Sequence, residues 1–220
     1  VLLPTLSLGK KKGQQISCVG NLHQLSVSWK MYADDSRGRL VSPFYYVEGS
    51  VYNNSSEVNT NAWVLGSMDD DTAIYAPVEP GVLDSTNLNG IRRGRVHPYA
   101  KSHAVYHCPA DQSMNTKGLM RARRVRSYAI NGWMGGTHVH SQSNYHVFRR
   151  EEDLVKPGPA LTWVFIDEHE KSINDGWFAV DMKGGDGLLD APATRHNNGY
   201  GITFADGHSE IWKLTDTRSI

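Results

Sequence analysis

Histidine and carboxylate side chains in the second half of the chain have types and spacings that suit a divalent cation. Nine residues separate His196 from Asp206-Gly207, and the apolar run 163–166 places Asp167 at the end of a predicted strand. Their oxygen and nitrogen atoms suit Ca²⁺, Zn²⁺ or Mn²⁺. The expected cofactor is therefore Ca²⁺ or another divalent cation, and the alternative is a hydrogen-bond network that fixes loops. The six candidate ligands are Asp167, His169, Asp175, His196, Asp206 and His208.

A second chemical feature is the basic segment 91–150, which carries eleven Lys and Arg against one acid although the whole chain has a net charge of zero. Guanidinium groups bind carboxylate or sulfate, and aromatic rings stack on sugars or bases, so the segment suits an acidic polymer. The alternative is a solvated basic face that pairs with the acidic flanks. The candidate substrate-binding residues are Arg92, Arg93, Arg95, Lys101, Arg121, Arg123, Arg124, Trp133, Tyr145 and Arg149.

The same segment supplies the residue types of a polysaccharide lyase. Such an enzyme neutralises a uronate carboxylate with Arg, Asn or His and removes the adjacent proton with Tyr or His. This hypothesis rests on residue type alone, and its candidate catalytic residues are Tyr128, His107, Arg126, Asn131, His97 and Tyr99. A hydrolase is less favoured, because Glu151-Glu152-Asp153 is typical of the acidic start of a helix.

The elements that must position these residues follow from hydrophobic periodicity. Apolar side chains recur every three or four residues from Ile16 to Tyr32, which predicts an amphipathic helix that ends before Asp34-Asp35. Strands are expected at 161–166, 177–180, 201–205 and 209–214. Asp206-Gly207 is typical of a two-residue turn between the last two.

Several motifs occur in one order along the chain. They are Leu2-Leu3-Pro4, Ile16-Ser17-Cys18 with Asn21-Leu22, Met31-Tyr32-Ala33-Asp34-Asp35, Tyr106-His107-Cys108-Pro109, Arg126-Ser127-Tyr128 with Asn131-Gly132, Asp167-Glu168-His169, and His196 with Asp206-Gly207. In this order they resemble the prepilin-like proteins that carry a carboxy-terminal His-x9-Asp-Gly signature, relatives of the type II secretion pseudopilins. One departure is that the membrane-spanning start of that family is missing, and Val1-Leu2-Leu3 is similar to the stub of such a segment.

The resemblance implies an α+β fold in which a long N-terminal helix packs on an antiparallel β-sheet below an enlarged, loop-rich head. Residues 1–36 would form the helix and residues 37–220 the head, together a single domain. It also implies export to the cell envelope, cell surface or medium, assembly through the helix, and membrane contact only through the missing segment. Calcium-stabilised carboxy-terminal regions of pseudopilins favour Ca²⁺ by analogy.

The two cysteines, Cys18 and Cys108, are either buried free thiols or a disulfide. Because the resemblance implies export, we expect the disulfide, which would remove about 4–5 kcal/mol of loop-closure entropy from the unfolded chain.

The resulting functional expectation is a pseudopilin-like exported protein whose basic head binds acidic polysaccharide. Phosphate contacts would also suit nucleic acid, but exported proteins meet acidic polysaccharide more often. The alternative is that the head is itself a lyase of uronate-containing glycans.

Overall fold

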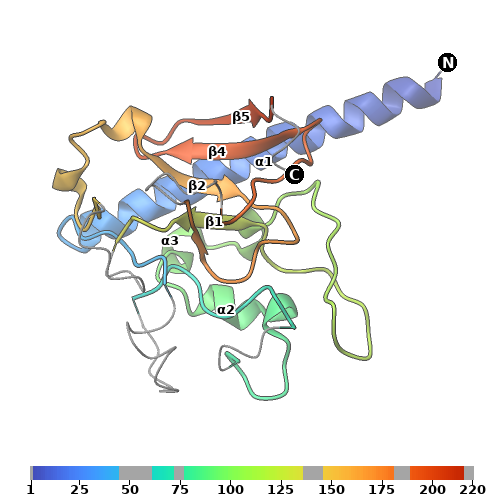
Figure 1. Ribbon diagram of the computed structural model, residues 1–220, viewed down its shortest axis with the longest axis horizontal. Helices are drawn as coiled ribbons and strands as arrows, with labels where there is room; N and C mark the ends of the chain where they lie inside the picture. Colours follow the sequence, from blue (N-terminus) through green and yellow to red (C-terminus); the bar gives the residue numbers. More distant parts are fainter. Residues whose placement is uncertain (1, 45–60, 72–76, 136–145, 181–188, 216–220) are drawn as a thin grey trace.

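The computed structural model describes residues 2–44, 61–71, 77–135, 146–180 and 189–215. A long helix, α1 (Leu2–Asp35), crosses one face of a β-sheet, and its N-terminal part extends beyond the sheet (Figure 1). The buried side of α1 is formed by Cys18, Leu22, Leu25 and Trp29. The predicted apolar stripe is confirmed from Leu22 onward, whereas Ile16 is 63% exposed because it lies on the side of the helix opposite Leu25.

The sheet has five strands in the order β3-β1-β2-β4-β5. They are β1 (Tyr128–Asn131), β2 (Trp163–Asp167), β3 (Trp177–Phe178), β4 (Gly199–Phe204) and β5 (Ser209–Lys213). Three neighbouring pairs are antiparallel, but β3 runs parallel to β1. The α+β expectation is confirmed. The expectation of a purely antiparallel sheet is wrong, because β3 lies beside β1 and runs in the same direction as β1.

The predicted turn at Asp206-Gly207 is present between β4 and β5. Gly207 has a φ of 96°, which glycine adopts without strain. The Gly207 carbonyl accepts a hydrogen bond from His23 Nδ1 at 2.8 Å and lies 3.4 Å from Ser26 Oγ, and both of these residues belong to α1. This turn therefore ties the carboxy-terminal hairpin to the helix.

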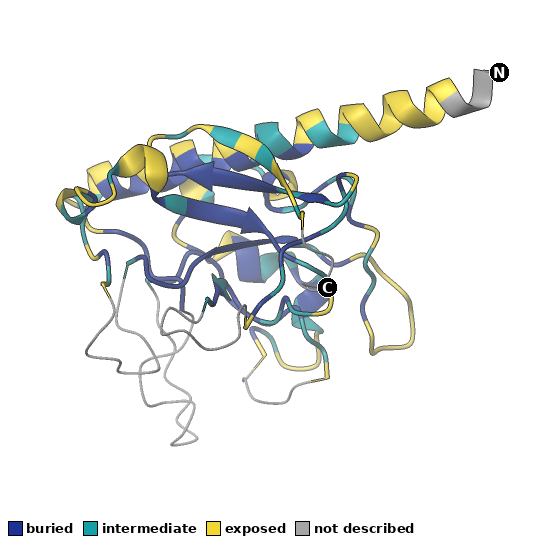
Figure 2. Cartoon of the chain, turned by 45° about the horizontal axis from the view of Figure 1, so that its top comes forward, coloured by how far each residue is buried: buried dark blue, intermediate teal, exposed yellow. Residues whose placement is uncertain are grey.

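A close approach between α1 and β4 brings the helix into contact with the sheet. A Cβ atom at Gly201 would lie 2.4 Å from Leu22 Cδ1 and 3.1 Å from Cys18 Sγ. Only glycine leaves room for the helix at this position. In Figure 2 the part of α1 beside the strands carries dark, buried residues, whereas most of its projecting N-terminal part is exposed.

The remaining helices of the described residues are short and lie in the connections. They are η1 (Asp84–Thr86), α2 (Leu88–Arg92), α3 (His97–Ala100), η2 (His103–Tyr106), η3 (Glu151–Asp153) and η4 (Pro159–Leu161). The segment around α3 and η2 is held against α1, because Asn21 Nδ2 donates to the His107 carbonyl at 3.0 Å and Tyr99 Oη to Asp35 Oδ2 at 3.0 Å. The expected acidic helix start at 151–153 is present as the single turn η3.

Within the part of the chain that the structure describes, none of the helices has both the length and the apolar character that crossing a lipid bilayer requires.

Candidate metal centre

Four buried side chains with metal-binding atoms meet where α1 packs on the sheet. Cys18 lies on α1, Cys108 follows η2, Asp167 ends β2, and His196 precedes β4. One ligand atom from each of the four lies within 4.8 Å of all the others. Four distant chain segments therefore contribute to one group.

The distances among these atoms are close to those of a tetrahedral site. Cys108 Sγ lies 3.3 Å from His196 Nε2, which is 3.8 Å from Asp167 Oδ2, and Cys18 Sγ lies 3.9 Å from the same Asp167 oxygen. With Zn–S and Zn–N or Zn–O distances of roughly 2.0–2.3 Å, ligand atoms of a tetrahedral site are about 3.3–3.8 Å apart. Since all four atoms lie within 4.8 Å of one another, movements of roughly 1 Å or less would place them around one ion.

The Asp167 carboxylate is oriented by its neighbours so that one oxygen faces the group. Its Oδ1 atom pairs with Arg195 Nη1, while Oδ2 faces Cys18 and His196. Arg195 also donates to the Glu168 carbonyl at 2.8 Å, and its Nη2 lies 3.3 Å from Asp111 Oδ2. This arrangement leaves Oδ2 of Asp167 for a monodentate contact with a cation.

The protonation of the group follows from its burial. Burial lowers the pKa of His196 to about 4, so the imidazole is neutral at pH 7 and offers a lone pair. Burial also raises the pKa of Asp167 to about 6. The neighbouring Cys108 and then burial raise the pKa of the Cys18 thiol well above its usual value. A metal ion would therefore displace protons when it binds.

Residues around the four side chains fix their positions. Tyr128 Oη donates to Cys18 Sγ at 3.3 Å, and Tyr128 is fully buried. The Cys108 N–H donates to Ser127 Oγ at 3.1 Å, and this hydroxyl donates to Asp111 Oδ2 at 2.6 Å. Hydrogen bonds of this kind orient metal ligands and tune their basicity.

The expected disulfide is not formed. Cys18 and Cys108 are both buried free thiols, although their sulfur atoms lie within 4.8 Å of one another. The expectation that the two cysteines are neighbours is confirmed. The predicted bond between them is absent from the structure, in which both side chains are free thiols.

Of the six predicted metal ligands, the structure brings together Asp167 and His196 only. Asp206 and His208 pair with each other at the exposed hairpin tip, with Oδ1 2.6 Å from Nδ1. His169 Nδ1 accepts a hydrogen bond from the Lys171 N–H at 3.1 Å, and Asp175 Oδ1 accepts one from the Trp177 N–H at 3.0 Å. The six predicted ligands therefore lie at separate places and do not form one site.

The predicted catalytic residues do not meet at one surface. Tyr128 is fully buried, and burial raises the pKa of its hydroxyl well above the usual value, which opposes a role as a base. Arg126 is 1% exposed and donates to the carbonyls of Tyr128 and Asp175 at 2.7 and 2.6 Å. In this conformation a polysaccharide at the surface reaches neither side chain.

The other four predicted catalytic residues lie in different places. His97 and Tyr99 are on α3, His107 follows η2 and is partly buried, and Asn131 ends β1. Asn131 Nδ2 donates to the Trp163 carbonyl at 3.0 Å, so it stabilises the join between β1 and β2.

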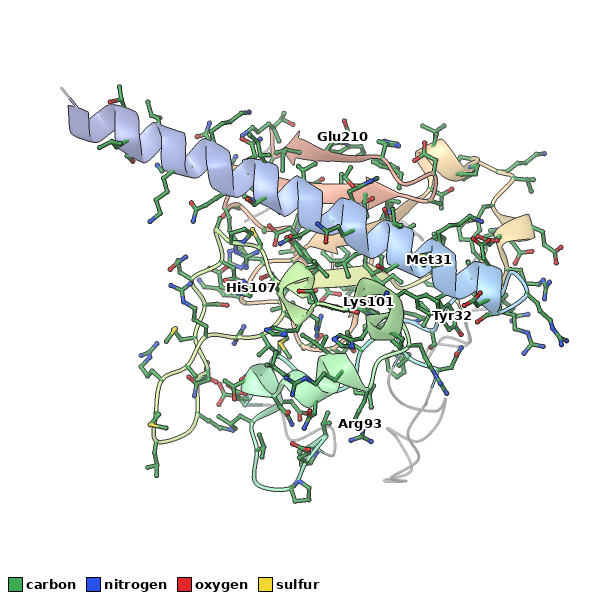
Figure 3. All side chains as sticks on the ribbon, turned by 180° about the vertical axis from the view of Figure 1, so that it is seen from behind. Met31, Tyr32, Arg93, Lys101, His107 and Glu210 are labelled. Carbon is green, nitrogen blue, oxygen red and sulfur yellow. The ribbon has the colours of Figure 1, made fainter. Side chains whose placement is uncertain are left out.

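The predicted substrate-binding residues have different environments. Arg124 and Trp133 are buried, and Tyr145 lies outside the described residues. The other seven are exposed but spread over several loops, among them Lys101 beside α1 and Arg93 farther from it (Figure 3). They are Arg92, Arg93, Arg95, Lys101, Arg121, Arg123 and Arg149.

Cys18 and Cys108 are the members of the centre that the sequence did not identify as ligands. The available signal was their position: Cys18 lies one helical turn before Leu22 on the apolar side of the predicted helix, and Cys108 lies next to His107. Two cysteines alone fit a disulfide and a metal site equally well.

Comparisons of the chain with protein-family models, with curated proteins and with solved structures gave no match. The fold and the centre define the class: an α+β protein with a buried group that could hold a metal ion.

Proposed function

We propose that this protein binds one divalent metal ion, preferably Zn²⁺, through Cys18, Cys108, Asp167 and His196. The observation that carries the proposal is the convergence of the four ligand atoms within 4.8 Å. Two sulfur atoms and an imidazole favour Zn²⁺ over Ca²⁺, since Ca²⁺ takes six to eight oxygen ligands.

The role of the ion is to hold the fold together. A site with four protein ligands has no open position for a substrate, which is typical of structural zinc. The ion would join α1 to the end of β2 and to the segments around Cys108 and His196.

Titration of the metal-free protein with Co²⁺ tests the proposal. Co²⁺ bound by two thiolates gives intense charge-transfer absorption, which we expect to saturate at one ion per chain and to disappear on addition of Zn²⁺. Cys108→Ser and His196→Gln should weaken or abolish the signal. The matched control is His103→Gln, which removes an exposed histidine that lies outside the centre. A protein with no thiolate absorption, or with equal signal in all variants, contradicts the proposal.

A second candidate function is pseudopilin-type assembly of an exported protein through α1. The observation that favours it is the exposed apolar surface of the projecting part of the helix, where Leu6, Leu8 and Ile16 are 68, 66 and 63% exposed (Figure 1). We expect Leu6→Lys with Leu8→Lys to abolish self-association in analytical ultracentrifugation. Val155→Lys, at an apolar residue that is 77% exposed elsewhere, is the control. Monomeric wild-type protein at all concentrations would argue against assembly.

A further inference from the structure

A cleft of about 310 Å³, lined by both polar and apolar groups, lies between α1 and the segment that carries His196. The helix contributes Leu8, Lys11, Lys12, Gln14 and Gln15, and the other side contributes Ala110, Arg195, His196 and Asn197. The cleft lies against His196, one of the four proposed metal ligands, and its cationic residues lie outside the basic segment 91–150. Its volume suits one or two sugar units rather than a folded partner.

The charge of the cleft is positive. The described residues that line it include Lys11, Lys12 and Arg195 and no carboxylate. Both lysines are exposed, and the described part of the chain has no carboxylate in an ion pair with either. Arg195 is held by Asp111 and Asp167 on its other side. An anionic group in the cleft would therefore gain two cations that the protein itself does not neutralise.

The remaining lining groups are amides and small apolar surfaces. Gln14 Nε2 donates to the Pro109 carbonyl at 2.9 Å, which fixes this side chain at the wall and leaves its oxygen as an acceptor. Gln15 and Asn197 add further donors and acceptors, and Leu8 and Ala110 add apolar surface. Amides bind hydroxyl groups, and apolar carbons pack on the C–H face of a sugar ring.

We propose that this cleft binds a carboxylated sugar unit of an acidic polysaccharide, with the lysines on the carboxylate and the amides on the hydroxyl groups. Nucleic acid is less favoured, because no Phe, Tyr or Trp is among the described residues that line the cleft, so none is there to stack on a base. The inference goes beyond metal binding and does not depend on it. It identifies where a polysaccharide would bind, in place of the dispersed arginines of residues 91–150.

The test is calorimetric titration of the full chain with trigalacturonate, compared with a neutral galactose trisaccharide, with citrate and with anionic lipid vesicles. We expect trigalacturonate to bind best. The double variant Lys11→Gln with Lys12→Gln should weaken the binding of trigalacturonate about tenfold, as expected for the loss of two exposed charge contacts. The matched control is Lys156→Gln with Lys171→Gln, which removes the same charge from exposed lysines outside the cleft and should change affinity less than about twofold.

Each other outcome overturns the inference. Equal losses in the two double variants would indicate non-specific charge attraction, and equal binding of citrate would indicate a general anion site. Preference for the neutral trisaccharide or for vesicles would identify a different ligand. The metal content of every variant is measured in parallel, so loss of sugar binding with retained metal separates failure of this site from failure of the metal centre.

Discussion

The Nε2 atom of His196 lies 3.3 Å from the Sγ atom of Cys108, although 88 residues separate the two in the chain. Burial holds the pKa of this histidine at about 4, so a neutral imidazole faces the thiol at pH 7. No local element explains this contact, because one residue follows η2 and the other precedes β4. The proposed metal ion would give both residues a common function.

Removal of the metal should destabilise the fold. An ion present at about 1,000 times its dissociation constant adds about 4 kcal/mol to the free energy of unfolding, which is about 10 °C in Tm for a chain of this size. We expect a chelator to lower the Tm by that amount and added Zn²⁺ to restore it. The measurement is differential scanning calorimetry, with the Cys108→Ser variant as the control that should not respond. A wild-type Tm that the chelator does not change would contradict a structural role of the metal ion.

Tyr128→Phe should weaken metal binding without unfolding the protein. The change removes only the hydroxyl that donates to Cys18 Sγ at 3.3 Å, and loss of such a supporting bond costs about tenfold or more in metal affinity. Affinity is measured by competition with a chromophoric chelator. The control is Tyr106→Phe, because the Tyr106 hydroxyl is equally buried and has no hydrogen-bond partner in the described structure. Equal affinities in the two variants would refute the supporting role.

Gly201→Ala should separate α1 from the sheet. The new Cβ would lie 2.4 Å from Leu22 Cδ1 and 3.1 Å from Cys18 Sγ, so the buried Leu22 side chain, the helix or the strand must move. Overpacking of this kind costs about 1–3 kcal/mol, and here it also crowds Cys18, one of the proposed metal ligands. Gly13→Ala is the control, since nothing lies within 4 Å of its Cβ position and alanine favours the helix by about 1 kcal/mol. Urea unfolding should show a lower free energy of unfolding for Gly201→Ala and a higher one for Gly13→Ala. An unchanged free energy of unfolding in Gly201→Ala would refute the close contact.

Asp190→Asn should stabilise the protein above pH 6 and have little effect near pH 4. Burial raises the pKa of Asp190 from 3.8 to about 6, so the folded state binds a proton more tightly than the unfolded state. The free energy of unfolding therefore falls as pH rises through this interval, by up to about 3 kcal/mol for a shift of about two pKa units. The asparagine amide would remove that loss, and its oxygen could still accept the Ala179 N–H, which now donates to Asp190 Oδ2 at 2.6 Å.

The same substitution should also affect Glu168. This residue is fully buried, and burial followed by the charge of Asp190 raises its pKa well above the usual value. Removal of the Asp190 charge therefore lowers the cost of ionising Glu168 at neutral pH. Unfolding measured at several pH values checks both effects, and a gain in stability that is the same at pH 4 and pH 7 would contradict them.

The sequence predicted those elements whose periodicity is long or whose turn is specific. α1 and the hairpin around Asp206-Gly207 belong to this group. β1 was missed because Tyr128 to Asn131 is short, buried on both faces and preceded by arginines, so it shows no alternation. The parallel pairing of β3 with β1 depends on tertiary packing and has no local signal.

The candidate site was predicted in part for similar reasons. Asp167 and His196 follow from their residue types and positions, and the proximity of Cys18 to Cys108 was also expected. Composition could not reveal burial, so Arg126 and Tyr128 were assigned to a surface although they support the core. The cleft beside Arg195 depends on how α1 passes that segment, which no spacing in the sequence encodes.

The most direct test of the central claim is native mass spectrometry of the full chain, prepared with Zn²⁺ and without reductant and followed by alkylation of its thiols after chelation. Metal binding predicts a mass increase of one zinc ion that chelator removes, and two alkylated cysteines in the metal-free protein. A chain without zinc, two hydrogen masses lighter and with no alkylated cysteine, would show that Cys18 and Cys108 form a disulfide and would contradict the metal centre.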